Sequence, residues 1–222
     1  MTEFADLLRA VRAENLDIMG GFDLRPDDGL TDRYQTLVLL GPLEPGFWAT
    51  FTAFDEWRDQ KPDPVDRWST RVVTRLAKRF GARALFPFGG PPWHPFFSWA
   101  LRSGRAWSSP VSLLVHDQAG LLVSYRGALA MPERLILPEA PSSPCETCVD
   151  RPCVTACPAS ALTDQGYDVP ACQAYLSTTE GTQTCMSAGC QVRRACPVSQ
   201  NYARDPDQSA YHMGRPRCAY RP

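Results

Sequence analysis

Cysteine is absent from the first 144 residues of this 222-residue chain, and all nine cysteines fall between Cys145 and Cys218. An excess of positive charge is also absent: 23 basic residues face 24 acidic ones, the formal net charge is −1, and only two of the basic residues are lysines. Such a chain lacks the basic surface typical of nucleic-acid-binding proteins. The longest apolar stretch, residues 36–43, is far too short to span a bilayer, and the N-terminus lacks the basic-then-apolar order of a secretory signal. We therefore expect a cytoplasmic protein with no nucleic-acid and no membrane partner.

The cysteine distribution divides the chain in two. The Pro-rich stretch "LPEAPSSP", residues 137–144, lies directly before the first cysteine. A proline-rich segment at a sharp change of composition is typical of a linker. The sequence therefore predicts one domain over residues 1–140 and a second, cysteine-rich domain over residues 141–222.

The first domain shows both helical and strand periodicity, which predicts an α+β fold class. Helices are predicted at residues 3–16, 46–59 and 63–81, the last with proline near its start and glycine at its end. Strands are predicted at residues 16–22, 35–41 and 82–88. Two further strands, residues 111–116 and 121–129, are separated by "DQAG" and predict a β-hairpin.

The cysteines follow two related patterns. The first four read C-x2-C-x4-C-x3-C-P, and three later ones read C-x4-C-x5-C-P, with Cys172 between the two groups. Three closely spaced thiols before a Cys-Pro pair match the bacterial ferredoxin motif with its middle gap widened by two residues. Eight thiols suffice for two [4Fe–4S] clusters with four ligands each. Cys218 stands apart near the C-terminus, and we expect it to be a thiol that binds no metal.

Zinc binding and structural burial are the two alternatives to iron–sulfur clusters. Zinc could occupy two four-cysteine sites, although structural zinc sites usually pair C-x2-4-C motifs and often include histidine. The thiols could also be buried structural residues, but burial alone would not concentrate them or repeat Cys-Pro. A disulfide framework explains an odd number of cysteines in a cytoplasmic chain poorly. Arg193 and Arg194, just before Cys196, could raise the potential of an anionic cluster or simply form a solvated basic face.

"CETCVDRPCVTACPASAL", the lone Cys172 and "CMSAGCQVRRACPV" together resemble the ferredoxin-like domain of epoxyqueuosine reductases and of related corrinoid reductive dehalogenases. In that family the fourth cysteine of each motif binds the cluster of the other motif. The resemblance implies a first ligand set of Cys145, Cys148, Cys153 and Cys196. It implies a second set of Cys157, Cys172, Cys185 and Cys190. The gaps within the motifs are longer here than in the family.

The first domain is similar, over residues 82–131, to a shortened form of the family's cobalamin-binding, nitroreductase-like domain. In the reductases the loop matching "FPFGGPPWHP" carries a proton-donating carboxylate, but residues 86–95 contain no Asp or Glu, and His94 is their only titratable side chain. His94 could act as the acid or could merely pack, and the same holds for His116. Four aromatic residues could wall a cofactor pocket or fill a core: Trp93, Phe96, Phe97 and Trp99.

We therefore expect a redox protein with two [4Fe–4S] clusters that passes single electrons to a partner protein or a small-molecule acceptor. One alternative is a corrinoid-dependent reductase that binds cobalamin in the first domain. Loss of a general acid typically costs about a hundredfold to ten-thousandfold in rate, so we expect electron transfer rather than this catalysis. A third hypothesis makes the clusters structural elements of an interaction module.

Overall fold

A computed structural model describes residues 2–30, 33–164 and 166–214 of the chain. The chain combines α-helices with antiparallel β-sheets, as the α+β prediction requires. It divides into two compact units. Unit 1 comprises residues 1–107 and 123–143, and unit 2 comprises residues 108–122 and 144–222. Within the described residues, every helix is too short or too polar to cross a membrane.

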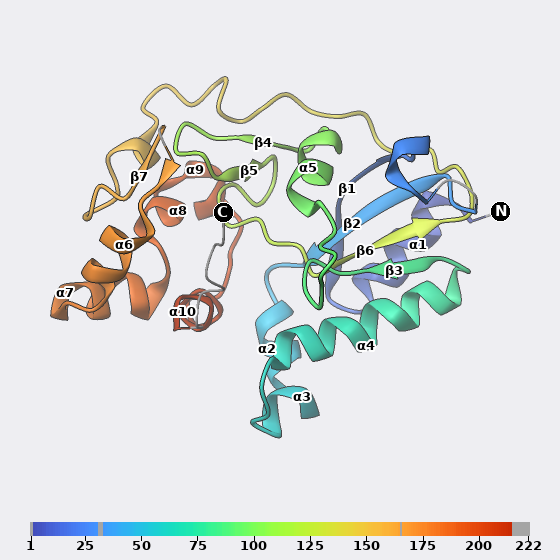
Figure 1. Cartoon of the computed structure of the whole chain (residues 1–222), viewed down its shortest axis with the longest axis horizontal. Coiled ribbons are helices and arrows are strands. Elements are labelled where there is room, and N and C mark those ends of the chain that lie inside the picture. The colour runs from blue at the N-terminus through green and yellow to red at the C-terminus, as the bar shows by residue number, and fades with distance from the viewer. Residues whose placement is uncertain (1, 31–32, 165, 215–222) are drawn as a thin grey trace. The chain divides into compact units, whose positions relative to one another are not determined.

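Unit 1 is built on a four-stranded antiparallel sheet with the strand order β1-β2-β6-β3 (Figure 1). The strands are β1 (Leu16–Asp23), β2 (Thr36–Pro42), β6 (Gly127–Met131) and β3 (Arg83–Leu85). Every residue of the central strand β2 is buried, which shows that both faces of the sheet are covered. The run of apolar residues predicted this, because a strand exposed on one face would alternate with polar residues.

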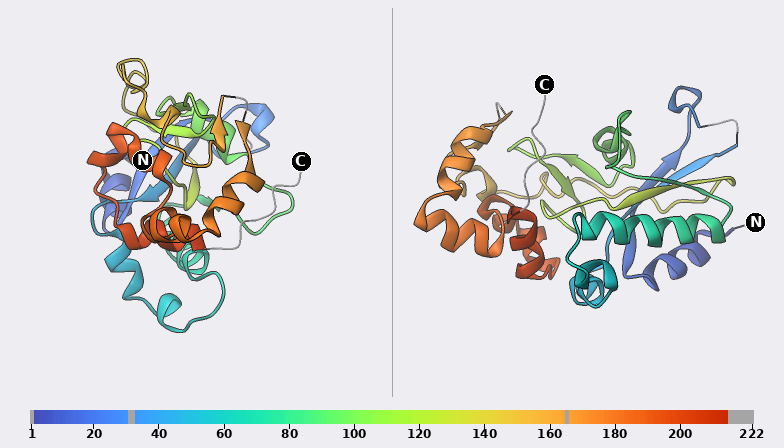
Figure 2. Two further views of the ribbon diagram at one scale, coloured as in Figure 1. Left: turned by 90° about the vertical axis from the view of Figure 1, so that its left-hand side faces the viewer. Right: turned by 60° about the horizontal axis from the view of Figure 1, so that its bottom comes forward.

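Helices pack on both faces of this sheet. In Figure 2, α1 (Phe4–Arg12) and α4 (Pro64–Arg79) lie along one face, and α5 (Phe96–Arg102) lies against the other. The long helix α4 begins with a proline at its first position and is followed by Gly81 with a φ of +62°. Proline is suited to the first turn of a helix, and glycine adopts the left-handed conformation that ends one.

The prediction of one continuous helix over residues 46–59 is wrong. The segment forms two short helices, α2 (Phe47–Thr52) and α3 (Asp55–Arg58), and between them Phe54 takes an extended conformation with φ −90° and ψ 160°. The break lets Trp57 pack edge-on against both Trp48 and Phe51, with ring centroids 5.1 and 5.5 Å apart. Aromatic packing therefore replaces a straight helix here.

The predicted hairpin of residues 111–116 and 121–129 is also wrong. Strand β5 (Leu114–His116) belongs to a two-stranded sheet with β4 (Ala106–Ser108), whereas β6 pairs with β2 and β3. An isolated bridge between His116 and Gly120 closes a tight turn, and residues 121–126 leave it without forming a strand.

Unit 2 contains short helices and little sheet (Figure 1). It contains strand β5, and a short ladder joins β7 (Leu162–Thr163) to β8 (Gly166–Tyr167). The helical elements are a 3-10 helix η2 (Pro152–Val154), α6 (Val169–Leu176), α7 (Thr179–Gly181), a π-helix η3 (Thr182–Met186), α8 (Gln191–Ala195), α9 (Pro197–Asn201) and α10 (Pro206–Gly214). All eight cysteines predicted as ligands lie in this unit.

Candidate metal centre

The first predicted ligand set surrounds one cavity of unit 2. Cys145, Cys148, Cys153 and Cys196 all line a cavity of about 500 Å³. The remaining walls are largely prolines and small apolar residues, among them Pro144, Pro152, Pro197, Val115 and Leu121. The structure thus brings together three cysteines of the first motif and the last cysteine of the second motif, a separation of more than forty residues in sequence.

Local backbone geometry turns the first three cysteines toward one another. Arg151 adopts a left-handed conformation with φ 41° and ψ 53°, and Pro152 then occupies the first position of the 3-10 helix η2. The chain reverses at Arg151, which carries Cys153 into the interior, where it is buried. Cys145 and Cys148 stay half-buried in the loop before the turn.

Cys196 owes its position to a break between two helices. It lies between α8 and α9 with an extended backbone, φ −65° and ψ 124°, and Pro197 opens α9. A residue that precedes proline is driven out of the helical conformation, so the Cys-Pro pair itself makes the break. The proline of the second Cys-Pro pair thus ends α8 at Cys196 and begins α9.

The other three thiols of this cavity act electrostatically on Cys153. Burial raises the pKa of the Cys153 thiol, and the neighbouring Cys145, Cys196 and Cys148 raise it further. Four thiolates gathered in a partly buried cavity repel each other unless protons or a cationic group neutralise them. Iron ions of a cluster would supply that positive charge.

A segment outside the cysteine motifs closes the cavity at Cys196. A Cβ atom at Gly120 would lie 3.1 Å from the Cys196 sulfur and 2.5 Å from the Ser199 backbone nitrogen. The backbone N–H of Leu121 donates to the Ser199 hydroxyl at 2.8 Å, and the Arg193 guanidinium donates to the Leu121 carbonyl oxygen. Sequence reasoning placed residues 108–122 in the first domain and missed this wall of the cavity.

The second predicted set is distributed over four elements. The Cys157 sulfur accepts a hydrogen bond of 3.2 Å from the backbone N–H of Ala161, and Cys172 is half-buried in α6. Cys185 is buried in the π-helix η3, and Cys190 directly precedes α8. Single π-helical turns are rare and are frequently found at functional sites.

Two contacts join elements of this second set. Cys185 acts electrostatically on Cys190, and the backbone N–H of Gly189, which precedes Cys190, donates to the Cys185 carbonyl oxygen at 2.9 Å. Helix α6, which carries Cys172, packs against the π-helix that carries Cys185, and the Tyr175 and Thr184 hydroxyls are hydrogen-bonded across them at 3.2 Å. The structure therefore supports the grouping of Cys172 with Cys185 and Cys190 through their elements. Cys157, the last cysteine of the first motif, is half-buried.

Burial raises the pKa of the Cys190 thiol, while the N–H groups of Arg193 and Val192 and the positive charge of Arg193 lower it. Burial favours the neutral thiol, and the donors and the guanidinium favour the thiolate that binds metal. The surroundings of Cys190 thus contain groups suited to stabilising a bound anionic centre.

In the part of the chain that the structure describes, no group of three or more His, Cys, Asp or Glu side chains is arranged to hold a metal ion. A zinc ion needs its ligand sulfurs about 2.3 Å from one centre. A [4Fe–4S] cluster binds each thiolate to a different iron atom, so its ligands surround a volume instead of converging on a point. Four cysteines line the cavity of about 500 Å³, and such a lining would suit ligands of the second kind.

The histidines raised by the sequence lie in very different surroundings. His94 is exposed overall and stacks on Trp99 with ring centroids 5.5 Å apart. Partial desolvation of its ring, followed by the charge of Arg83, lowers its pKa. His116 is 0% exposed, and its Nδ1 accepts hydrogen bonds from the backbone N–H groups of Gln118 and Ala119. His116 therefore holds a turn in unit 2.

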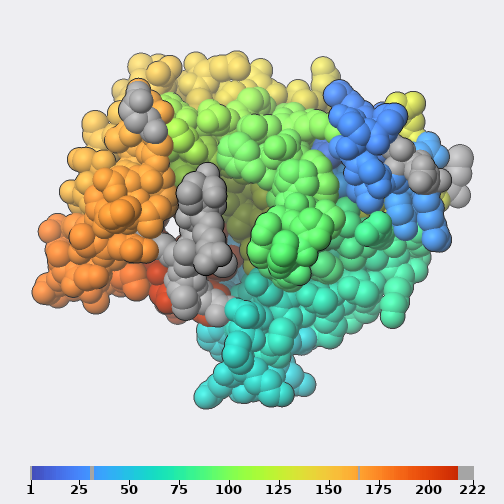
Figure 3. Space-filling view, in the orientation of Figure 1, coloured from blue at the N-terminus to red at the C-terminus, as the bar shows by residue number. Residues whose placement is uncertain are grey.

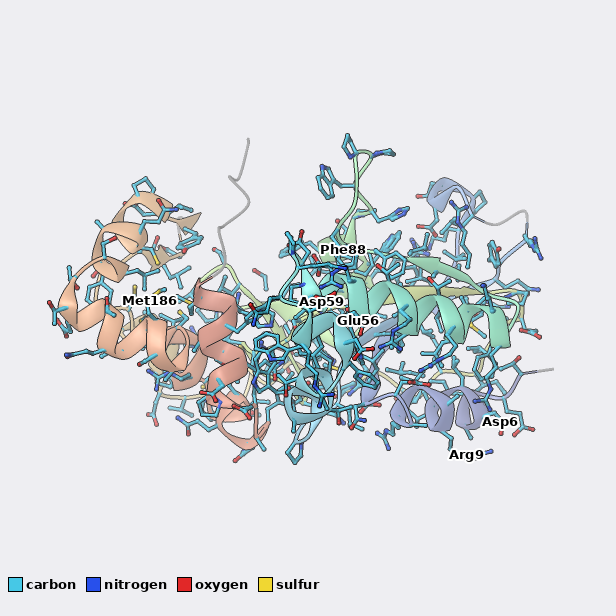
Figure 4. All side chains as sticks on the ribbon, turned by 90° about the horizontal axis from the view of Figure 1, so that it is seen from below. Asp6, Arg9, Glu56, Asp59, Phe88 and Met186 are labelled. Atoms are coloured by element: carbon cyan, nitrogen blue, oxygen red, sulfur yellow. The ribbon has the colours of Figure 1, made fainter. Side chains whose placement is uncertain are left out.

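The four aromatic residues of the expected cofactor pocket divide into two kinds. Phe96 and Trp99 are buried in the core, whereas Trp93 and Phe97 are 63% and 52% exposed. Figure 4 shows the loop that follows Phe88 projecting from unit 1, and Figure 3 shows this part of the chain, in green, as a raised surface. His212 lies in α10, and Cys218 lies outside the described residues.

Comparison of the chain with protein-family models, with curated proteins and with solved structures found no match.

Proposed function

We propose that the protein is a redox protein that carries two [4Fe–4S] clusters in unit 2 and transfers single electrons. The observation that carries the proposal is the cavity of about 500 Å³ lined by Cys145, Cys148, Cys153 and Cys196. Its volume exceeds the needs of one ion, and its four thiols come from two motifs that are far apart in sequence. The ferredoxin-like spacing of those motifs adds independent support.

Cys145, Cys148, Cys153 and Cys196 would hold the first cluster through their thiolates. Cys157, Cys172, Cys185 and Cys190 would hold the second cluster, and the proximity of Cys185 and Cys190 supports that assignment. Each cluster, when bound, accepts or releases one electron at a time. The protein's part is to hold the thiolates, to limit the access of water and to set the local charge.

Metal and sulfide analysis of protein purified without air tests the proposal. We expect about eight iron and eight sulfide per chain, and a visible absorption that bleaches when dithionite is added and returns on mild reoxidation. Zinc without sulfide would contradict the cluster assignment. Clusters that cannot be reduced reversibly would instead favour the structural role in an interaction module.

Single-cysteine variants test the exchange of ligands between the motifs. Cys157→Ser should damage the cluster of Cys172, Cys185 and Cys190 and spare the first, so about half of the iron should remain. Cys153→Ser, the matched variant from the same motif, should damage the first cluster and spare the second. Electron paramagnetic resonance of the reduced proteins distinguishes the two outcomes. Cys218→Ser should leave the iron content unchanged.

We place electron transfer ahead of corrinoid-dependent reduction because the loop of residues 86–95 offers a poor acid. His94 is its only titratable side chain, it is exposed, and its lowered pKa favours the neutral imidazole near neutral pH. Titration with cob(II)alamin under nitrogen tests this order. Stoichiometric binding with a shifted corrinoid spectrum, together with loss of turnover in His94→Ala, would reverse it.

A further inference from the structure

Arg193 and Arg194 are adjacent in α8, but their side chains have different surroundings. Arg193 is half-buried, and it donates from Nη1 to the carbonyl oxygen of Leu121. Arg194 is exposed, and its Nε donates to the carbonyl oxygen of Gly189 at 3.1 Å. The pair provides one desolvated and one solvated guanidinium on the same short helix.

Arg193 faces the second ligand set. Its charge lowers the pKa of the Cys190 thiol, and in return Cys190 raises the pKa of the Arg193 guanidinium. The helix geometry places the two residues together, because Cys190 is the N-cap of α8 and Arg193 lies in the first turn of that helix. The backbone N–H of Gly189, the residue before Cys190, donates to the carbonyl oxygen of Cys185 at 2.9 Å, which ties Cys190 to a second member of this set.

Arg193 also faces the first ligand set, through Leu121. The residue whose carbonyl oxygen accepts the Arg193 hydrogen bond is itself part of the wall of the four-cysteine cavity. The same peptide segment is fixed by the bond from Leu121 N–H to Ser199, three residues after Cys196. The guanidinium therefore lies between Cys190 of one set and the lining of the other.

The charge of Arg193 persists in this position. Burial lowers the pKa of its guanidinium, but an arginine side chain stays protonated in proteins. Within the described residues, the ionisable groups that act on it are Cys190 and Tyr167. A desolvated cation without a carboxylate partner costs free energy, and an anionic centre nearby would offset that cost.

We propose that Arg193 supplies one fixed positive charge shared by both cluster sites and thereby raises the reduction potentials of both clusters. This inference rests on the proposed function. Reduction of a four-thiolate cluster adds one negative charge to a group that is already anionic. A nearby fixed cation stabilises the reduced form more than the oxidised form, and the effect is large where water is excluded.

The test compares Arg193→Gln with Arg194→Gln in anaerobically purified full-length protein, titrated with dithionite and monitored by absorption and electron paramagnetic resonance. In Arg193→Gln, we expect the ratio of reduced to oxidised cluster at a fixed applied potential to fall about tenfold at both sites. For a one-electron couple this is a shift of about 59 mV to more negative potential. Arg194→Gln should leave both potentials unchanged, because water already screens that charge.

Arg193→Lys separates charge from hydrogen-bond geometry. It keeps a cation that can still donate to Leu121, so both potentials should stay near those of the unmodified protein. Arg193→Lys also tests the proposal if Arg193→Gln fails to fold. A potential shift of about 59 mV in Arg193→Lys would contradict the proposal that the charge of residue 193 sets the potentials.

Iron and sulfide are measured on the same samples. Unmodified protein without clusters would overturn the proposed function. Fully loaded Arg193→Gln with unchanged potentials, or with a shift confined to one cluster, would overturn the shared-cation proposal and leave the proposed function standing.

Discussion

Units 1 and 2 are held together in different ways. Unit 1 has a 16-residue helix, a four-stranded sheet and large buried side chains such as Trp68, Phe47 and Phe51. The longest described helix of unit 2 has nine residues, and its buried apolar residues are mostly small. Three of its buried side chains are cysteines predicted to bind metal: Cys153, Cys185 and Cys196. Unit 1 thus folds around an apolar core, and we propose that unit 2 depends for its stability on clusters bound by its thiols.

Removal of iron should break unit 2 and spare unit 1, which is the largest effect that we expect. Treatment with an iron chelator and an oxidant should remove nearly all of the folding free energy of unit 2, of the order of 5–15 kcal/mol for a domain. Hydrogen exchange measured by mass spectrometry reports both units at once. Amides of α6 and α10 should exchange rapidly, and those of β2 and β6 should stay protected.

An apo-protein in which unit 2 keeps its protection would contradict this comparison. It would show that short helices and thiols suffice for the fold of unit 2. The clusters would then contribute to function without being needed for stability.

The elements of unit 1 that follow from local pattern were predictable. Helix α4 has proline at its start, apolar residues at helical spacing and glycine after its end, and β2 is a short apolar run; both lie within a residue or two of their predicted bounds. The break at Phe54 was not predictable, because the packing of Trp57 on Trp48 and Phe51 is decided in three dimensions. The hairpin failed because the partners of β6 are β2 and β3, which are distant in sequence.

The sequence motifs predicted that Cys145, Cys148, Cys153 and Cys196 belong together, and these four cysteines line one cavity; that they bind a cluster is our proposal. The wall formed by residues 108–122 was not predictable, since its signal is a single glycine whose importance depends on Cys196 and Ser199, nearly eighty residues away. The contrast between Arg193 and Arg194 likewise depends on which side of α8 meets Leu121. The spacing of the cysteines can therefore be recognised in the sequence, whereas the residues that pack around them are determined by the tertiary structure.

Gly120→Ala should cost the protein its first cluster, the next largest effect. The new methyl group would meet the Ser199 backbone at 2.5 Å and the Cys196 sulfur at 3.1 Å, and Gly120 also has a φ of +54°. Displacement of Cys196 should remove about half of the iron and leave the signal of the second cluster.

Gly29→Ala is the matched control for backbone strain. Gly29 has a φ of +67° and nothing within 4 Å of its Cβ position, so the variant carries the strain without the collision. Its iron content should be unchanged. Equal loss of iron in both variants would show that the close approach to Cys196 has no part in the effect.

Trp68→Ala should lower the free energy of unfolding of unit 1 and leave the iron content unchanged. Trp68 is 1% exposed and packs edge-on against Phe47 and Phe51, with ring centroids 5.3 and 6.1 Å apart. Removal of a buried indole typically costs about 3–5 kcal/mol. Urea unfolding followed by hydrogen exchange in β2 measures the loss, and Trp68→Phe should recover part of it. Release of iron from the folded variant would show that the two units do not behave independently.

The smallest effect that we expect is a pH-dependent contribution of Glu56 to unit 1. The hydrogen bonds from Arg71 lower the pKa of this half-buried carboxyl, and burial partly opposes them. A carboxyl whose pKa is lower in the folded state stabilises the fold above its unfolded pKa of about 4.3. That contribution is lost as the pH falls through the lower folded pKa. Because Arg71 is 39% exposed, the pair is worth less than about 1 kcal/mol near neutral pH.

Glu56→Gln should therefore lower the free energy of unfolding of unit 1 slightly at pH 7, and the difference from the unmodified protein should vanish in strongly acidic solution. Asp6→Asn is the matched control, because the ion pair of Asp6 and Arg9 is more exposed (Figure 4). It should give a still smaller difference at pH 7. Hydrogen exchange of β2 amides reports unit 1 alone, so acid loss of iron from unit 2 does not enter the comparison. A Glu56→Gln difference that grows as the pH falls would have the wrong sign for a carboxylate stabilised by Arg71.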